Sequence, residues 1–120
     1  LSLLIPAFTG LVHAQSVRME VENIHSFSES LSNALTNLSF LSPGSRQTLS
    51  IPLEQNLSIS VKENSILVSY FADGMKAPFV SEIESNLLLQ YESNDEEDHE
   101  LVLLRTSQGI TVQFPEILLP

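Results

Sequence analysis

LSLLIPAFTGLVHA, residues 1–14, opens the chain and contains no Asp, Glu, Lys or Arg. Residues 15–41 continue it as QSVRMEVENIHSFSESLSNALTNLSFL, without a turn signal. In this second segment apolar residues recur every three or four positions, the spacing of one apolar stripe on an α-helix. The stripe consists of Val17, Val21, Ile24, Phe27, Leu31, Ala34, Leu35 and Leu38. Residues 1–41 are therefore predicted to form one long N-terminal helix with a hydrophobic first part.

The break Ser42-Pro43-Gly44 ends this pattern, and apolar residues alternate with polar ones afterwards. Short strands separated by turns are predicted over 48–52, 57–61, 66–71, 86–91, 101–105 and 110–114. The second and third are predicted to form one hairpin, and the last two form another around Ser107-Gln108-Gly109. Residues 77–80 are expected to be irregular or an edge, and the tail 115–120 is expected to be a last edge strand. The predicted fold class is α+β, with a long hydrophobic N-terminal helix followed by a small antiparallel, immunoglobulin-like β-sandwich. The predicted domains are an assembly helix, 1–41, and a β-sandwich head, 45–120.

The charge and the missing cysteine exclude several functional classes. The chain has 15 acidic residues against 5 basic ones, a formal net charge of −10. A nucleic-acid partner is excluded because binding to phosphates requires a basic surface, and docking to anionic lipid is disfavoured for the same reason. Because cysteine is absent, the chain can form no disulfide, thiolate nucleophile or cysteine-ligated zinc site.

Residues 1–14 allow several interpretations. A secretory signal peptide would explain the apolar core and the small residue Ala14, but a basic start is missing. A transmembrane anchor needs roughly 20 apolar residues, and Pro6, Gly10 and His13 interrupt this shorter run. The favoured interpretation is a helix that packs against copies of itself, and a buried core helix is the fourth. For residues 31–41, a helix that covers a sheet of its own domain also stays open.

The sequence offers no catalytic residues, and we expect neither enzymatic activity nor a cofactor. The acidic run 92–100, ESNDEEDHE, could bind calcium through its carboxylates. It lacks a turn glycine and the ligand spacing of an EF-hand, so a solvated loop is the preferred interpretation. The histidines His13, His25 and His99 lie too far apart in sequence to form a recognisable metal motif. We therefore expect no metal site.

Two sequons are present, Asn37-Leu-Ser39 and Asn56-Leu-Ser58. Both asparagines are candidate glycosylation sites if the chain is exported by a host that glycosylates, and both would then face solvent. One lies near the predicted end of the helix and the other just before a predicted strand.

The whole plan of the chain resembles archaeal type IV pilins and the related archaeal flagellins, in which a hydrophobic N-terminal helix leads directly into a β-sandwich head. The resemblance rests on the apolar start 1–14, the stripe over 17–41, the Ser42-Pro43-Gly44 break and the strands that follow. It implies an extracellular filament at the cell surface, serving adhesion or attachment, whose partners are copies of the same chain and, before assembly, the membrane. The implied assembly interface is Leu3, Leu4, Ile5, Phe8, Leu11, Val12, Val17, Val21 and Ile24.

A second hypothesis is an exported or membrane-anchored β-sandwich that binds a ligand without polymerising. In that case the acidic run or residues 73–80 would contact the ligand. The two hypotheses differ in what residues 1–14 do, because only a filament subunit requires them to be buried by other copies. An enzyme remains possible only if a cofactor or partner supplies the chemistry.

Overall fold

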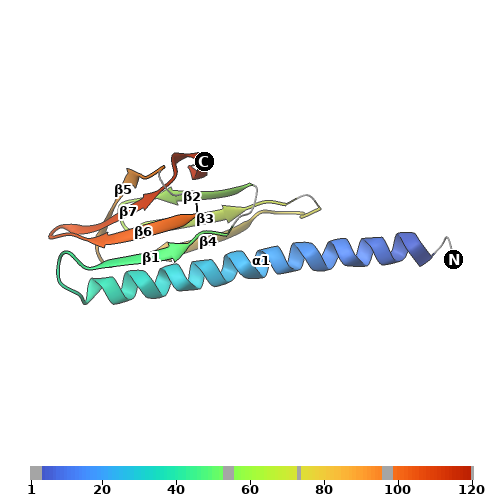
Figure 1. Ribbon diagram of the computed structural model, residues 1–120, viewed down its shortest axis with the longest axis horizontal. Helices are drawn as coiled ribbons and strands as arrows, with labels where there is room; N and C mark the ends of the chain where they lie inside the picture. The colour runs from blue at the N-terminus through green and yellow to red at the C-terminus, as the bar shows by residue number, and fades with distance from the viewer. Residues whose placement is uncertain (1–3, 53–55, 73, 96–98, 120) are drawn as a thin grey trace.

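A computed structural model describes residues 4–52, 56–72, 74–95 and 99–119, and the side chains of its helix from Glu20 onward. One helix is followed by seven strands and a short 3-10 helix (Figure 1). The elements are α1 Leu4–Ser39, β1 Arg46–Ser50, β2 Leu57–Val61, β3 Ser65–Tyr70, β4 Phe79–Glu84, β5 Leu88–Ser93, β6 Glu100–Arg105, β7 Gly109–Phe114 and η1 Glu116–Leu118.

The strands form two sheets that enclose a common core. One sheet has four strands in the order β1-β6-β7-β5, and the other has three in the order β2-β3-β4. All neighbouring strands are antiparallel except β5, which runs parallel to β7 with Leu88 opposite Gly109. The predicted hairpin over 57–71 is confirmed as β2 and β3, and the hairpin around residues 107–109 is confirmed as β6 and β7.

The apolar residues that alternate with polar ones along the strands form the core. Successive side chains of a strand point to opposite faces, so every second apolar residue is turned inward. Ile59, Val68, Leu101, Leu103, Val112 and Phe114 are completely buried by this rule. The outward positions of β2 and β3 are mainly serines, which tolerate solvent.

The helix closes one open side of the sandwich. From residue 24 onward its buried side chains recur every three or four positions: Ile24, Phe27, Leu31, Ala34, Leu35 and Leu38. This stripe contacts β1 and β4, which are edge strands of the two different sheets. Covering both edges protects them from pairing with other chains. Side chains from both predicted segments, 1–41 and 45–120, therefore share one core.

The opposite side of the sandwich is closed by the C-terminal segment and a hydrogen bond between the sheets. The backbone N–H of Leu89 on β5 donates to the carbonyl oxygen of Glu63, 2.7 Å away, in the β2–β3 turn. The 3-10 helix η1 contacts β2, and Leu118 and Leu119 pack against the core.

The predicted fold class is wrong in two respects. A long apolar N-terminal helix is not seen: where its side chains are described, from Glu20 to Ser39, α1 has one buried stripe and polar residues on its other sides. The sandwich is also not purely antiparallel, because β5 joins the four-stranded sheet parallel to β7. The helix is thus an amphipathic element of a small strand-rich domain with two sheets.

Three smaller expectations have different outcomes. The tail predicted as an edge strand contains η1 instead, where the N–H of Leu118 donates to the carbonyl of Pro115. Residues 77–80, expected to be irregular or an edge, lead into β4, and the second alternative is confirmed because β4 is an edge strand of the three-stranded sheet. The helix ends at Ser39 rather than at residue 41.

Candidate functional site

The two ends of the sandwich differ, and we name them by their connections. The tip carries the α1–β1 connection, the β2–β3 turn and the β6–β7 turn. The N–H of Gly44 donates to the carbonyl of Arg105, which joins the α1–β1 connection to the end of β6. The base carries the β3–β4 and β5–β6 connections and η1. The N-terminal part of α1 extends past the base and clear of the sheets (Figure 1).

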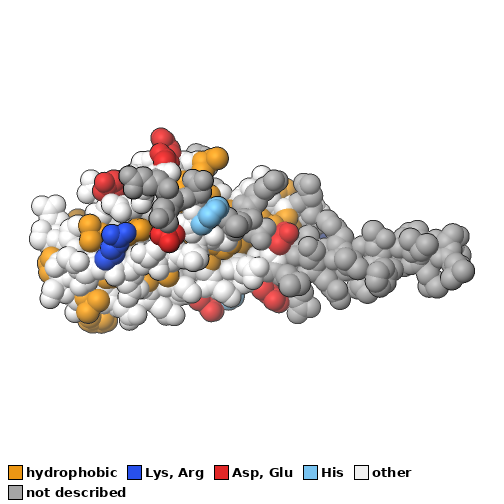
Figure 2. Space-filling model, in the orientation of Figure 1, with side chains coloured by type: hydrophobic (Ala, Val, Ile, Leu, Met, Phe, Trp, Pro, Cys, Tyr) orange, Lys and Arg blue, Asp and Glu red, His pale blue; other side chains and the backbone are white. Residues whose placement is uncertain are grey.

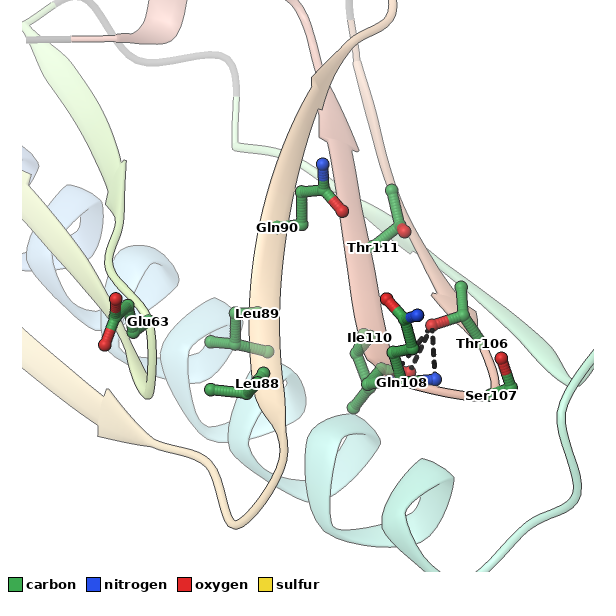
Figure 3. A pocket seen from close by; sticks show the side chains of 10 residues that line it. Glu63, Leu88, Leu89, Gln90, Thr106, Ser107, Gln108, Ile110 and Thr111 are labelled. Atoms are coloured by element: carbon green, nitrogen blue, oxygen red, sulfur yellow. Dashed lines mark hydrogen bonds between the residues drawn. The ribbon is translucent and has the colours of Figure 1, made fainter.

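A groove with a volume of about 600 Å³ lies at the tip, where β5 and β7 begin. We call it the tip groove. Figure 3 shows Glu63 of the β2–β3 turn on one side of β5 and the β6–β7 turn on the other side. The lining residues are Glu63, Leu88, Leu89, Gln90, Thr106, Ser107, Gln108, Gly109, Ile110 and Thr111.

A glycine and a threonine shape the tip groove. A Cβ atom on Gly109 would lie 2.1 Å from the carbonyl oxygen of Leu88, so only glycine allows β5 to approach β7 this closely. The hydroxyl of Thr106 donates to the carbonyl of Gly109, 3.1 Å away, and accepts from the N–H of the same residue at 3.0 Å. These bonds hold the β6–β7 turn in one conformation, so the groove has a preformed wall.

The lining of the tip groove is mostly uncharged. Its polar lining consists of hydroxyl and amide side chains, and Glu63 is the one ionisable residue among the lining residues. Leu88, which is 56 % exposed, adds an apolar surface that a partner could cover.

The predicted assembly residues fall into three groups. Leu3 lies outside the described residues, while Leu4, Ile5, Phe8, Leu11, Val12 and Val17 belong to the part of α1 whose side chains are not described. Val21 is half-buried and packs against the core of its own chain. Ile24 is completely buried in that core, so its side chain is not available to a neighbouring copy. The same helical stripe that predicts an interface here serves the chain's own sheets.

Both sequon asparagines are exposed. Asn37 lies on the solvent side of α1, opposite the buried stripe. Asn56 precedes β2 with φ of 65°, a left-handed conformation that asparagine tolerates better than most residues. Their exposure meets the requirement for glycosylation, which stays a prediction.

The acidic run is partly strand. Glu92 and Ser93 end β5, and Glu100 begins β6, while residues 96–98 lie outside the described part of the chain. Asp95 accepts a hydrogen bond from the N–H of Glu116 at 3.0 Å and one from the hydroxyl of Ser93 at 3.2 Å. Among the described residues, no group of three or more His, Asp or Glu side chains could hold a metal ion.

The histidines have different surroundings. His25 is exposed on α1, where its Nε2 lies 3.1 Å from a carboxylate oxygen of Glu29 and its ring meets Phe79 edge to face. His99 is exposed before β6, and its carbonyl accepts from the N–H of Ile51. The side chain of His13 lies outside the described part of α1.

A polar contact that the sequence did not reveal joins α1 to the base of the sandwich. The hydroxyl of Tyr70, at the end of β3, donates to a carboxylate oxygen of Glu20. Tyr70 is only 2 % exposed, so this contact satisfies a buried hydroxyl and fixes α1 where it leaves the sandwich. No local pattern links residues 50 positions apart.

The fold changes the ionisation of Tyr91. Its hydroxyl donates to the carbonyl of Phe114 at 2.9 Å, and the two rings pack with centroids 4.5 Å apart. Burial raises the pKa of Tyr91 above its usual value of 10.0, and the nearby carboxylates of Glu116 and Asp95 act in the same direction, while a hydrogen bond with Ser93 opposes them.

We expect this pKa shift to make stability depend on pH in alkaline solution. Because the folded state keeps the Tyr91 proton to higher pH than the unfolded state, the stabilisation is complete below pH 10 and is lost as the pH rises through the folded pKa. At pH 7, Tyr91→Phe should lose about 1 kcal/mol, the net value of one hydrogen bond. The difference between wild type and variant, measured by urea unfolding with circular dichroism, should shrink above pH 10. A difference that stays constant with pH would contradict this prediction.

The described part of the chain contains no helix that combines the length and the hydrophobicity needed to cross a membrane.

Sequence reasoning predicted the β6–β7 turn but missed the tip groove, because the groove depends on the register between β5 and β7. Comparisons of the chain with protein-family models, with curated proteins and with solved structures gave no match.

Proposed function

We propose that this protein is a structural subunit of an extracellular, type IV pilus-like filament, in which copies associate through the projecting N-terminal part of α1. The head would then lie on the outside of the filament and serve adhesion or surface attachment. The observation that carries the proposal is the projection of α1 beyond the sandwich (Figure 1).

The dimensions of the molecule support this role. A helix of 36 residues is about 54 Å long at 1.5 Å per residue, and the molecule measures 65 × 25 × 20 Å. Where the side chains of α1 are described, from Glu20 onward, Glu20 and Ile24 are among those that contact the head. The preceding turns extend past the sheets (Figure 1), and a single helix in water is only marginally stable. Burial against other copies would supply the missing stabilisation.

The energetics favour a polymer over a closed assembly. Residues 1–14 carry no charged side chain, and each Å² of apolar surface removed from water contributes about 25 cal/mol. A helix surrounded by other helices through different faces makes heterologous contacts, which generate open helical polymers when the rotation does not close. Repulsion between acidic heads opposes this, but salt screens it beyond about 10 Å at 0.1 M.

Electron microscopy of the full chain tests the proposal. Wild-type protein should form regular filaments, and Leu11→Arg should remain monomeric because a charge cannot be buried between packed helices without a partner. The matched control is Asn33→Arg, an equal charge change on the exposed side of α1 beside the head, which should still assemble. Circular dichroism should show the same folded head in all three. The proposal fails if the wild type stays monomeric, or if Leu11→Arg assembles as well as the control.

The alternative function is an exported binding module that does not polymerise. The observation in its favour is the preformed tip groove, whose hydroxyl and amide groups suit a neutral polar ligand. Under this alternative, wild-type protein and both variants would be monomers, and the groove would be the surface to screen for ligands.

A further inference from the structure

We propose that the heads of neighbouring copies contact each other end to end, with the exposed side chain of Ile117 at the base of one head entering the tip groove of the next. The inference rests on the proposed function, since it describes how heads contact one another within a filament. Its occupant is a second copy of this chain.

Ile117 and the tip groove lie at opposite ends of the same two strands. The groove surrounds Leu88 and Gly109, which begin β5 and β7, and η1 with Ile117 directly follows the end of β7 at Phe114. Six residues of strand separate the two ends by about 20 Å. Displacement of one copy along the direction of β7, combined with a rotation about that direction that keeps its projecting α1 clear of α1 in the next copy, therefore brings its Ile117 toward the groove of the next copy. Each head uses both surfaces, so the contact is heterologous and builds an open polymer when the rotation does not close a ring.

Hydrogen bonds and packing fix the segment that carries Ile117, and the Ile117 side chain faces solvent. Its side chain is 87 % exposed, while Leu118 and Leu119, which follow it, pack against the core. The N–H of Glu116 donates to Asp95, and the N–H of Leu119 donates to the carbonyl of Glu116 at 3.0 Å. An apolar side chain fixed in this way loses little conformational entropy when a partner buries it.

The charges of the two ends are complementary. Among the described residues at or next to the strand ends, the tip has three basic side chains, Arg46, Lys62 and Arg105, and two acidic ones, Glu63 and Glu84. The base has one basic side chain, Lys76, and four acidic ones, Glu92, Asp95, Glu100 and Glu116. On the face shown in Figure 2 a basic side chain lies toward the tip, with acidic side chains nearby. In a chain with a net charge of −10, tip-to-base contact is the arrangement that sets basic groups against acidic ones.

Cysteine cross-linking tests this contact without background, because the chain contains no cysteine. Gln90→Cys places a thiol in the tip groove and Ile117→Cys places one on η1. A disulfide forms only when the two Cα atoms approach to within about 7 Å. Under mild oxidation of assembled full-length protein, a mixture of the two single variants should give a covalent dimer, and the double variant should give a ladder of multimers.

The controls decide between a specific contact and random collision. Thr48→Cys is exposed on the four-stranded sheet outside the groove, and its mixture with Ile117→Cys should give no dimer. Raising the salt to 1 M, where the screening length is about 3 Å, should reduce the yield of the groove pair. An equal yield in the control mixture, or dimers formed mainly within one single variant, would overturn the proposed contact.

A second pair of variants does not depend on disulfide geometry. Ile117→Ser should shorten filaments or lower the fraction of assembled protein in sedimentation, because it removes the side chain that enters the groove. Val80→Ser changes another exposed apolar residue, 52 % exposed on the three-stranded sheet, and should have no such effect. Equal behaviour of the two variants would contradict the docking. Filaments without the Gln90–Ile117 cross-link would disprove the docking alone, whereas a cross-link without filaments would disprove the filament function alone.

Discussion

Leu31→Ala is expected to lower the free energy of unfolding of the whole domain by about 2–5 kcal/mol, the range for removing a buried leucine side chain. Leu31 lies in the middle of the buried stripe of α1 and has no exposed surface. It belongs to a core that includes side chains from both sheets, such as Ile66 and Leu103. Removal of its side chain leaves a cavity between the helix and the two edge strands that it covers.

The size of this effect follows from the construction of the fold. Small domains are stable by only about 5–15 kcal/mol, and here the helix closes the side of the sandwich between β1 and β4. A helix that served only as an anchor could be weakened without consequence for the sheets. Because α1 contributes to the shared core, the loss should unfold strands and helix together.

Urea unfolding followed by circular dichroism measures the change, with Ser32→Ala as the matched control. Ser32 is the exposed neighbour of Leu31 on the same helix, and surface substitutions usually change stability by less than about 0.5 kcal/mol. If Leu31→Ala and Ser32→Ala have the same midpoint, α1 is not part of the head's core, and the fold described above would be wrong.

The apolar stripe of the helix shows what a local sequence pattern can predict and what it cannot. The spacing of Ile24, Leu31 and Leu38 predicts that one face of a helix is buried, and this is confirmed. The pattern does not say what buries that face, since a neighbouring copy and the chain's own sheet require the same residues. Ile24 was assigned to an intermolecular interface for this reason and instead lies in the intramolecular core.

The strands were predictable because alternation is local, but their arrangement was not. β2 and β3 are joined by a short turn and were identified as a hairpin from sequence. β5 and β7 are separated by β6, and a strand shows the same alternation whether its partner runs parallel or antiparallel. Their parallel pairing depends on contacts between segments distant in sequence, and the predicted antiparallel sandwich was wrong at this point.

The tip groove was missed for the same reason. Gly109 was recognised as part of the turn between β6 and β7, where glycine is common. Its second role appears only when Leu88, 21 positions earlier, is placed opposite it. A glycine required by a close approach between distant strands gives the same local signal as a glycine required by a turn.

Gly109→Ala is therefore expected to destabilise the domain by about 1–3 kcal/mol, the usual cost of forcing extra volume into a packed site. The added Cβ would lie 2.1 Å from the carbonyl oxygen and 3.0 Å from the carbonyl carbon of Leu88. Both contacts are with backbone, so no side-chain rotation relieves them, and the start of β5 must move away from β7. That movement also weakens the hydrogen bond from the N–H of Leu89 to Glu63.

Urea unfolding and cross-linking together locate the effect. Ser107→Ala is the control, an exposed residue of the same turn, and it should change the unfolding midpoint little. In the Gly109→Ala background, displacement of β5 should also reduce cross-linking between Gln90→Cys and Ile117→Cys, because Gln90 moves with that strand. Wild-type stability in Gly109→Ala would mean that β5 and β7 are not in such close contact. Lower stability with unchanged cross-linking would mean that the displaced strand does not shape the surface on which the next copy docks.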